Sequence, residues 1–267
     1  MLFCKIMMND WRQTMGNRIP YNGIWSKHLI PSLLVYGFCC YLNLVHAAER
    51  VFINVYLKPH SDHVIVEHIK AFNQFWATQK APMSSVSPYL THYPAHITLY
   101  LAHYNQKQLP TLLYRINRLA QQERSLKVDA EPFRVGAGAY IMLGIKKSQS
   151  LQSLSDRIVF LLKDLRDHKA SIPAWAAQDQ NRQELFSLYG SPGVLARYEP
   201  HVSVLAAPSH LKAQQNLHQW QQAVALFNQH TSIQPSGIMD TLAVGIANEE
   251  GQIIAELASY HLNTSLG

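Results

Sequence analysis

Two segments of this chain share a pattern that constrains its fold more than any other feature. Residues 94–100 read PAHITLY and residues 200–205 read PHVSVL, so each has a proline one or two residues before a histidine and then alternates between polar and apolar residues. The side chains of a β-strand point alternately to its two faces. Each segment is therefore predicted to form a strand with one apolar and one polar face. Proline fits near the start of such a strand, where no backbone donor is required.

The segments around these strands alternate between the periodicities of strands and helices. Short apolar runs predict strands over residues 51–57, 96–102, 201–207, 239–247 and 253–262, with two more inside 133–146. Apolar residues that recur at intervals of three and four predict helices over residues 62–76, 109–123, 151–165 and 211–227. Similar elements surround the two histidines, which are 105 residues apart. This arrangement predicts an α+β fold with two similar lobes.

Two segments are less regular. Residues 166–200 form a long connection in which a short helix is predicted around residues 176–188. A connection of this length usually has a functional role, such as a lid, or is mobile. The Gly136-Ala137-Gly138 segment resembles a phosphate loop only superficially, because the third glycine and the following helix are missing. It is predicted to be a turn or a bulge.

Near the start of the chain, a basic pair is followed by an apolar stretch and then by small residues. Lys27 and His28 precede an apolar run over residues 29–45, and Ala47 and Ala48 follow it. This order is typical of a secretory signal with cleavage near the two alanines. The alternative is an uncleaved membrane anchor, because the run approaches the length needed to span a bilayer.

This leader divides the chain into a signal peptide over residues 1–48 and a domain over residues 49–267. The domain is expected to be exported, and hence periplasmic or secreted. All three cysteines, Cys4, Cys39 and Cys40, lie in the leader. The exported domain therefore has no thiol nucleophile and no thiolate metal ligand. The chain's formal charge of +6 suits anionic partners such as phosphates or RNA, although it identifies none of them.

The polar faces of the two motif strands hold the residues best suited to catalysis. Strand alternation is expected to place His96 with Thr98 and Tyr100, and His201 with Ser203. Cleavage of a phosphodiester needs one group that accepts a proton and another that donates one. Near neutral pH, one imidazole can be neutral while another is protonated. The two hydroxyls can donate to phosphate oxygens, so this chemistry requires no metal and no cofactor.

The paired motifs resemble the signature of the two-histidine (2H) phosphoesterase superfamily, which includes RNA 2′,3′-cyclic phosphodiesterases and 2′-5′ RNA ligase-like proteins. The resemblance implies a bilobal α+β fold, with two sheet-plus-helix lobes around a central cleft. It also implies metal-independent hydrolysis or transfer at 2′,3′-cyclic or 2′-5′ phosphodiesters of nucleotides or RNA. His96 and His201 are the expected catalytic residues, and Thr98 and Ser203 the expected phosphate-binding residues. The chain departs from the family in its leader, in the wide spacing of its motifs and in the connection over residues 166–200.

Further residues are candidates for substrate contacts. Tyr100 is a candidate for stacking on a base, with packing as the alternative. Tyr140 follows the glycine-rich turn and is a candidate to reach the cleft. Arg134 and Arg197 are candidate phosphate contacts, with a solvated surface charge as the alternative for each. The sequence leaves open the natural substrate, which histidine is the acid, whether the reaction is hydrolysis or ligation, and the oligomeric state.

Two other functions compete with this interpretation. His92, His96 and His103 suggest a zinc site, but Pro94 prevents the first two from lying one turn apart on a regular helix. The second competitor is a non-catalytic nucleotide- or RNA-binding module of the same fold, exported or membrane-anchored. Intact histidines in both motifs favour an enzyme, since binding alone does not require two proton-transfer groups.

Overall fold

The computed structural model describes residues 50–60, 62–79, 86–136, 140–206, 214–231 and 234–263, within a compact unit that begins at Ala48. The predicted leader lies outside these residues, as does the centre of the glycine-rich turn. No helix in the described residues is both long enough and apolar enough to cross a membrane.

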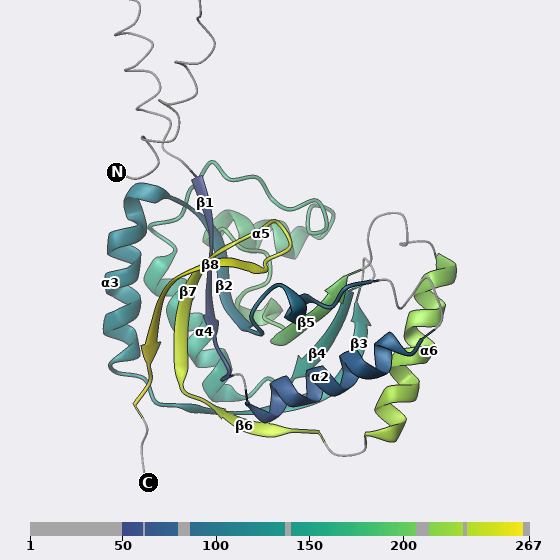
Figure 1. The fold of residues 1–267 in the computed structure, drawn as a ribbon. Helices are drawn as coiled ribbons and strands as arrows, with labels where there is room; N and C mark the ends of the chain where they lie inside the picture. The colour runs from purple at the N-terminus through teal and green to yellow at the C-terminus, as the bar shows by residue number, and fades with distance from the viewer. Residues whose placement is uncertain are drawn as a thin grey trace, which may run out of the picture. The chain divides into compact units, whose positions relative to one another are not determined.

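Two antiparallel four-stranded sheets form the framework of the unit (Figure 1). The first sheet has the strand order β2 (Ile97–Asn105), β1 (Arg50–Leu57), β7 (Thr241–Ala247) and β8 (Ile253–His261). The second has the order β5 (His201–Ala206), β4 (Tyr140–Ile145), β3 (Leu126–Gly136) and β6 (Ser236–Met239). The motif strands β2 and β5 are thus edge strands of different sheets, and they contact each other.

Each sheet is covered by two helices (Figure 1). Helices α3 (Leu109–Ala120) and α4 (Gln149–Leu162) pack on the first sheet, against β8 and β2 respectively. Helices α2 (Val64–Ala77) and α6 (Gln214–His230) pack on the second sheet, against β6 and β3 respectively. These contacts bury apolar helix faces against apolar sheet faces, as around Phe72, which stacks on Phe133 with ring centroids 4.3 Å apart. The predicted α+β fold with two sheet-plus-helix lobes is confirmed.

Both motif strands contain a β-bulge at the same place. In β2, Thr98 pairs with Tyr56 and Tyr100 pairs with Val55, so Leu99 is an extra residue in the strand. Such an extra residue bends the strand and changes the direction of the side chains that follow.

The bulge in β5 has the same position relative to its histidine. Ser203 pairs with Met142 and Leu205 pairs with Ile141, so Val204 is the extra residue. In each motif the bulge thus comes directly after the hydroxyl residue. Bulges are common at sheet edges and beside active sites.

The bulge in β2 overturns part of the predicted alternation. Tyr56, Asn54 and Phe52 share one face of β1 and pair with Thr98, Leu101 and His103, whereas Tyr100 pairs with Val55 on the other face. The prediction that Tyr100 shares a face with His96 and Thr98, and that Leu101 points to the core, is therefore wrong. Regular alternation cannot continue through a residue that has no partner on the neighbouring strand.

The strand predicted over residues 239–247 is two strands. Met239 ends β6 in the second sheet and Thr241 begins β7 in the first sheet, with Asp240 between them. The Asp240 carbonyl accepts from the backbone N–H of Leu262 at 2.7 Å. The chain therefore passes from one lobe to the other at Asp240, and the strand β6 was missed.

The connection over residues 166–200 forms hydrogen bonds with the rest of the domain. Its helix α5 (Gln180–Tyr189) begins four residues later than predicted, after Asp179 as N-cap, and ends at Gly190, whose φ of 73° suits a helix C-terminus. The backbone N–H of Asp167 donates to the carbonyl of His103 in β2 at 2.7 Å, and Gln152 Nε2 of α4 donates to the Leu195 carbonyl at 3.2 Å. The connection is therefore hydrogen-bonded to β2 and α4, and it forms one wall of the pocket described below.

Candidate active site

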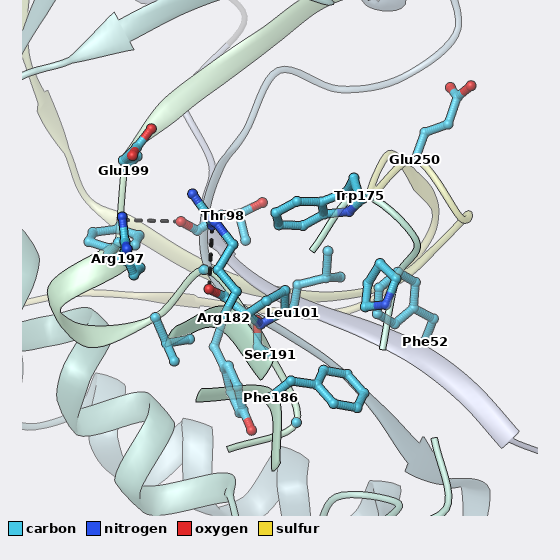
Figure 2. A pocket seen from close by; sticks show the side chains of 18 of the residues that line it. Phe52, Thr98, Leu101, Trp175, Arg182, Phe186, Ser191, Arg197, Glu199 and Glu250 are labelled. Atoms are coloured by element: carbon cyan, nitrogen blue, oxygen red, sulfur yellow. Dashed lines mark hydrogen bonds between the residues drawn. The ribbon is translucent and has the colours of Figure 1, made fainter. Parts of the chain in front are cut away.

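His96 and Thr98 from the first motif and His201 and Ser203 from the second line one pocket of about 740 Å³ (Figure 2). The structure thus brings together the four residues that the two motifs supply. The pocket lies where the edge strands β2 and β5 meet, with the connection as a further wall.

The two imidazoles are held in the same way. The Nδ1 atom of His96 lies 3.0 Å from the carbonyl oxygen of Pro94, and the Nδ1 atom of His201 lies 2.8 Å from that of Glu199. A carbonyl oxygen only accepts, so each Nδ1 must carry the proton and donate it. In each ring this leaves Nε2 as the nitrogen available for proton transfer.

Burial lowers the pKa of both imidazoles below the usual value of 6.5. For His96, the bond to Pro94 opposes this shift, and the charge of His201 lowers the pKa further. For His201, the carbonyl and the carboxylate of Glu199 oppose the shift, and Arg134 lowers the pKa further. The histidines therefore interact electrostatically and favour their neutral forms while the pocket holds no anion.

Thr98 has a buried partner that the sequence analysis missed. Asn54, in the centre of β1, is 0% exposed and donates from Nδ2 to Thr98 Oγ1 at 2.9 Å. The same nitrogen donates to the Gly251 carbonyl at 3.2 Å. The signal was present in the sequence, because an asparagine interrupts the apolar run over residues 51–57. A buried amide in such a run requires hydrogen-bond partners.

An aromatic contact holds the ring of His96. Tyr56 meets it edge-on, with ring centroids 5.5 Å apart and planes 68° apart. The Tyr56 hydroxyl donates to Glu256 Oε2 at 3.0 Å, and Lys58 binds the same oxygen at 2.7 Å. Burial and the Glu256 carboxylate raise the pKa of Tyr56, so this hydroxyl stays protonated.

Two backbone carbonyls of β2 receive hydrogen bonds from neighbouring elements. The Tyr198 hydroxyl donates to the Thr98 carbonyl at 3.1 Å and thereby joins the second motif to the first. The buried hydroxyl of Ser155, on α4, donates to the carbonyl of the bulged Leu99 at 2.7 Å. These bonds satisfy carbonyls of an edge strand and fix its position beside β5.

The two candidate tyrosines have different surroundings. The ring of Tyr100 is buried, and its hydroxyl donates to the carbonyl of Tyr189 at the end of α5. Tyr100 contributes to the pocket lining, but it is only 1% exposed, which favours the packing alternative over stacking on a base. Tyr140 begins β4 and is not one of the pocket-lining residues. The carboxylate of Glu250, which does line the pocket, contributes with burial to a raised pKa of Tyr140.

The two candidate arginines also differ. Arg197 lines the pocket, and its Nη2 lies 3.6 Å from a carboxylate oxygen of Asp179. Arg134 does not line it; its Nη2 lies 3.7 Å from Glu199. Arg197 is therefore the better placed of the two for contact with a phosphate.

Nothing in the described ranges resembles the predicted alternative of a zinc site. Among those residues, no three His, Cys, Asp or Glu side chains lie together as metal ligands. His92 lies 3.2 Å from the hydroxyl of Ser87, and His103 stacks on Phe52.

The chain matches a known protein family. A family model described as the 2′-5′ RNA ligase superfamily matches residues 60–231. The matched span covers more than half of the chain and contains both histidine motifs. Among curated proteins, no sequence matches the chain significantly.

Several solved structures are similar at low sequence identity. Escherichia coli LigT, complexed with NADP⁺, is 12% identical, and the match covers 81% of this chain and 99% of LigT, with a TM-score of 0.44. The protein TT0787 of Thermus thermophilus is 13% identical over 80% of this chain and 99% of TT0787, with a TM-score of 0.47. Kluyveromyces marxianus Usb1 is 12% identical over 80% of this chain and 99% of Usb1, with a TM-score of 0.47. The TM-scores all lie below 0.5, so the family assignment depends on the family model alone.

Proposed function

This chain belongs to the 2′-5′ RNA ligase superfamily, and on that premise we propose that it is a phosphodiesterase that needs no metal. Its substrates are 2′,3′-cyclic or 2′-5′ phosphodiesters of nucleotides or RNA. The observation that carries the proposal is the matched pair of imidazoles in one pocket. In each, Nδ1 is held by a carbonyl, and a hydroxyl residue follows two positions later.

The two imidazoles supply the two proton transfers that the reaction needs. The neutral imidazole accepts, at Nε2, the proton of the attacking water or hydroxyl, whose oxygen forms the new bond to phosphorus. The bond from phosphorus to the departing ribose oxygen breaks, and that oxygen takes the proton from Nε2 of the protonated imidazole. Each turnover thus exchanges the protonation states of His96 and His201, and water as attacking group gives a phosphomonoester.

The remaining polar groups stabilise the negative charge on the phosphate oxygens. The hydroxyls of Thr98 and Ser203 donate to non-bridging oxygens, and the protonated imidazole adds a positive charge. Arg197 is close enough to the pocket to contribute a second charge. Donors and charges that are already in position are the usual source of transition-state stabilisation in such a site.

Turnover by the full chain in excess chelator tests the proposal. We expect a 2′,3′-cyclic mononucleotide or a 2′-5′-linked dinucleotide to be converted to product, with the rate unaffected by the chelator. Chromatography of the products identifies the bond that was cleaved. Absence of turnover for both substrates, or a rate that requires added metal, would overturn the proposal.

We also propose that the domain is exported, on the basis of the leader pattern in residues 27–48. The mass of the protein isolated from the expressing cells tests this proposal. A mature form that begins near Ala48 in the exported fraction supports it, and an intact leader on protein in the cytosol contradicts it. An intact leader on membrane-bound protein indicates the anchored alternative.

A further inference from the structure

The pocket extends well beyond the two histidines. The connection over residues 166–200 supplies half of the lining residues. The volume of about 740 Å³ is in the upper part of the range of about 300–1,000 Å³ that is typical of ligand sites. The connection therefore encloses space that the phosphate chemistry does not explain.

One wall of this additional space is a stacked aromatic pair. Phe52 of β1 and His103 of β2 lie opposite each other in the sheet, with ring centroids 4.3 Å apart and planes 17° apart. Both residues line the pocket. The bulge at Leu99 turns the side chain of His103 toward the pocket. In a strand without the bulge, His103 would point to the other face of the sheet.

The connection adds an exposed tryptophan to the pocket lining. The side chain of Trp175 is 66% exposed, and the guanidinium carbon of Arg182 lies 5.2 Å from its ring centroid. In Figure 2, Trp175 and Phe52 lie toward the same end of the pocket. A large aromatic ring left open to solvent beside a cation offers a stacking surface to a planar ligand.

Two arginines that line the pocket share one carboxylate. The Nε atom of Arg182 and the Nη2 atom of Arg197 lie 3.5 Å and 3.6 Å from the same carboxylate oxygen of Asp179. One carboxylate therefore balances two guanidinium groups, both of which line the pocket. Glu199, Glu249 and Glu250 also line the pocket, so an anionic backbone would bind through direct contact with these two guanidinium groups rather than through a net positive charge.

We propose that the space between Trp175 and the Phe52–His103 pair is a nucleobase subsite for the nucleotide next to the one whose phosphate is attacked. Thr98 and His103 pair with Tyr56 and Phe52, which are four residues apart on β1, and this corresponds to about 13 Å at about 3.3 Å per residue. A single nucleotide cannot place its phosphate at one end of this distance and its base at the other. The substrate class is therefore an oligonucleotide of at least two residues, with Arg182 and Arg197 near its backbone.

The subsite rests on the proposed function, and a ratio of two activities tests it. The substrates are a 2′,3′-cyclic mononucleotide and a dinucleotide that ends in a 2′,3′-cyclic phosphate. In Trp175→Ala, we expect the dinucleotide-to-mononucleotide ratio of kcat/KM to fall by about 5- to 100-fold, the usual effect of one lost base–aromatic stack. Trp175→Phe should keep most of the ratio. Tyr114→Ala removes an equally exposed aromatic ring on α3 and should leave the ratio unchanged.

A binding measurement separates failure of the subsite from failure of the proposed function. The probe is the same dinucleotide, titrated by calorimetry into the double variant His96→Ala/His201→Ala. We expect the further change Trp175→Ala to weaken this binding at least about 5-fold, whereas Tyr114→Ala does not. An unchanged affinity and an unchanged activity ratio in the Trp175 variants would overturn the subsite. Weakened binding without turnover by the unsubstituted protein would retain the subsite and overturn only the enzymatic proposal.

Discussion

Asn54 donates a hydrogen bond from Nδ2 to Thr98 Oγ1 at 2.9 Å, from the strand next to the first motif. The orientation of its amide is determined by the Gly251 carbonyl, which accepts from the same nitrogen. Since Asn54 is the donor, the O–H of Thr98 is not used in this bond and is available to a phosphate oxygen. Asn54 is fully buried, so it is a positioning residue that acts through Thr98.

The first prediction concerns this positioning. Asn54→Ala should lower kcat/KM for a cyclic phosphodiester about 3- to 10-fold, because it removes a bond that orients Thr98. Thr98→Val should lower kcat/KM about 10- to 100-fold, the effect of one lost hydrogen bond to a charged group. The double variant Asn54→Ala/Thr98→Val should have the same kcat/KM as Thr98→Val alone, because Asn54 acts through Thr98. Additive losses would show that Asn54 acts independently of Thr98.

Asn228 provides a matched control for Asn54. It also makes two hydrogen bonds, to the backbone N–H and carbonyl of Phe133 in the other lobe. Asn228→Ala should lower the melting temperature and leave kcat/KM unchanged. Equal losses of activity in the two asparagine variants would indicate a general effect on stability.

The second prediction concerns the pH profile. Burial places the pKa of both active-site histidines below 6.5 in the free protein, so the singly protonated pair is most populated below that pH. The profile of kcat/KM should therefore be bell-shaped with its maximum on the acid side of 6.5. A bound phosphate anion raises both pKa values, so the profile of kcat should lie at higher pH. A kcat/KM maximum above pH 7 would contradict the lowered pKa values of the two histidines.

The third prediction concerns the free energy of unfolding. The folded-state pKa of each histidine is lower than its unfolded value. The contribution of the neutral histidines to stability is therefore present above pH 6.5 and is lost as the pH falls through the folded-state pKa. The melting temperature should therefore fall less between pH 6.5 and pH 5 in the double variant His96→Ala/His201→Ala than in the unsubstituted protein. Inorganic phosphate should reduce this fall in melting temperature in the unsubstituted protein but not in the double variant. Identical melting curves for the two proteins would exclude this linkage.

The fourth prediction concerns the bond between the two motif strands. Tyr198→Phe removes the donor to the Thr98 carbonyl and leaves that carbonyl without this partner, at a cost of about 1–3 kcal/mol. We expect the melting temperature to fall by about 2–12 °C. Tyr114→Phe, at an exposed position, should change it little. Thermal unfolding followed by circular dichroism measures both variants, and equal midpoints would show that the bond contributes nothing.

Periodicity predicted most of the secondary structure, because alternation and helical spacing report directly on which side chains are buried. It placed the helices α2, α3, α4 and α6 near their observed bounds, and it paired His96 with Thr98 and His201 with Ser203. These features depend on residues close together in the sequence.

The features that the sequence did not reveal depend on partners far away in the chain. A bulge at Leu99 exists only relative to the register of β1, so the burial of Tyr100 and the exposure of His103 to the pocket could not be read from β2 alone. The break at Asp240 depends likewise on two different sheets. Trp175 reaches the pocket because the connection folds back over β2, and no periodicity in that segment indicates such a path.

The most direct test of the central claim is the turnover of a 2′,3′-cyclic nucleotide by the full chain and its histidine variants. His96→Ala and His201→Ala should each lower kcat by about 10²–10⁴-fold, the usual contribution of general acid–base catalysis. The kcat of the double variant should be close to that of either single variant, because the two imidazoles act in one transition state. His92→Ala, which changes an exposed histidine outside the pocket, should leave kcat unchanged. An unchanged kcat in His201→Ala would contradict the paired mechanism, and nucleotide binding without turnover by the unsubstituted protein would identify a binding module instead.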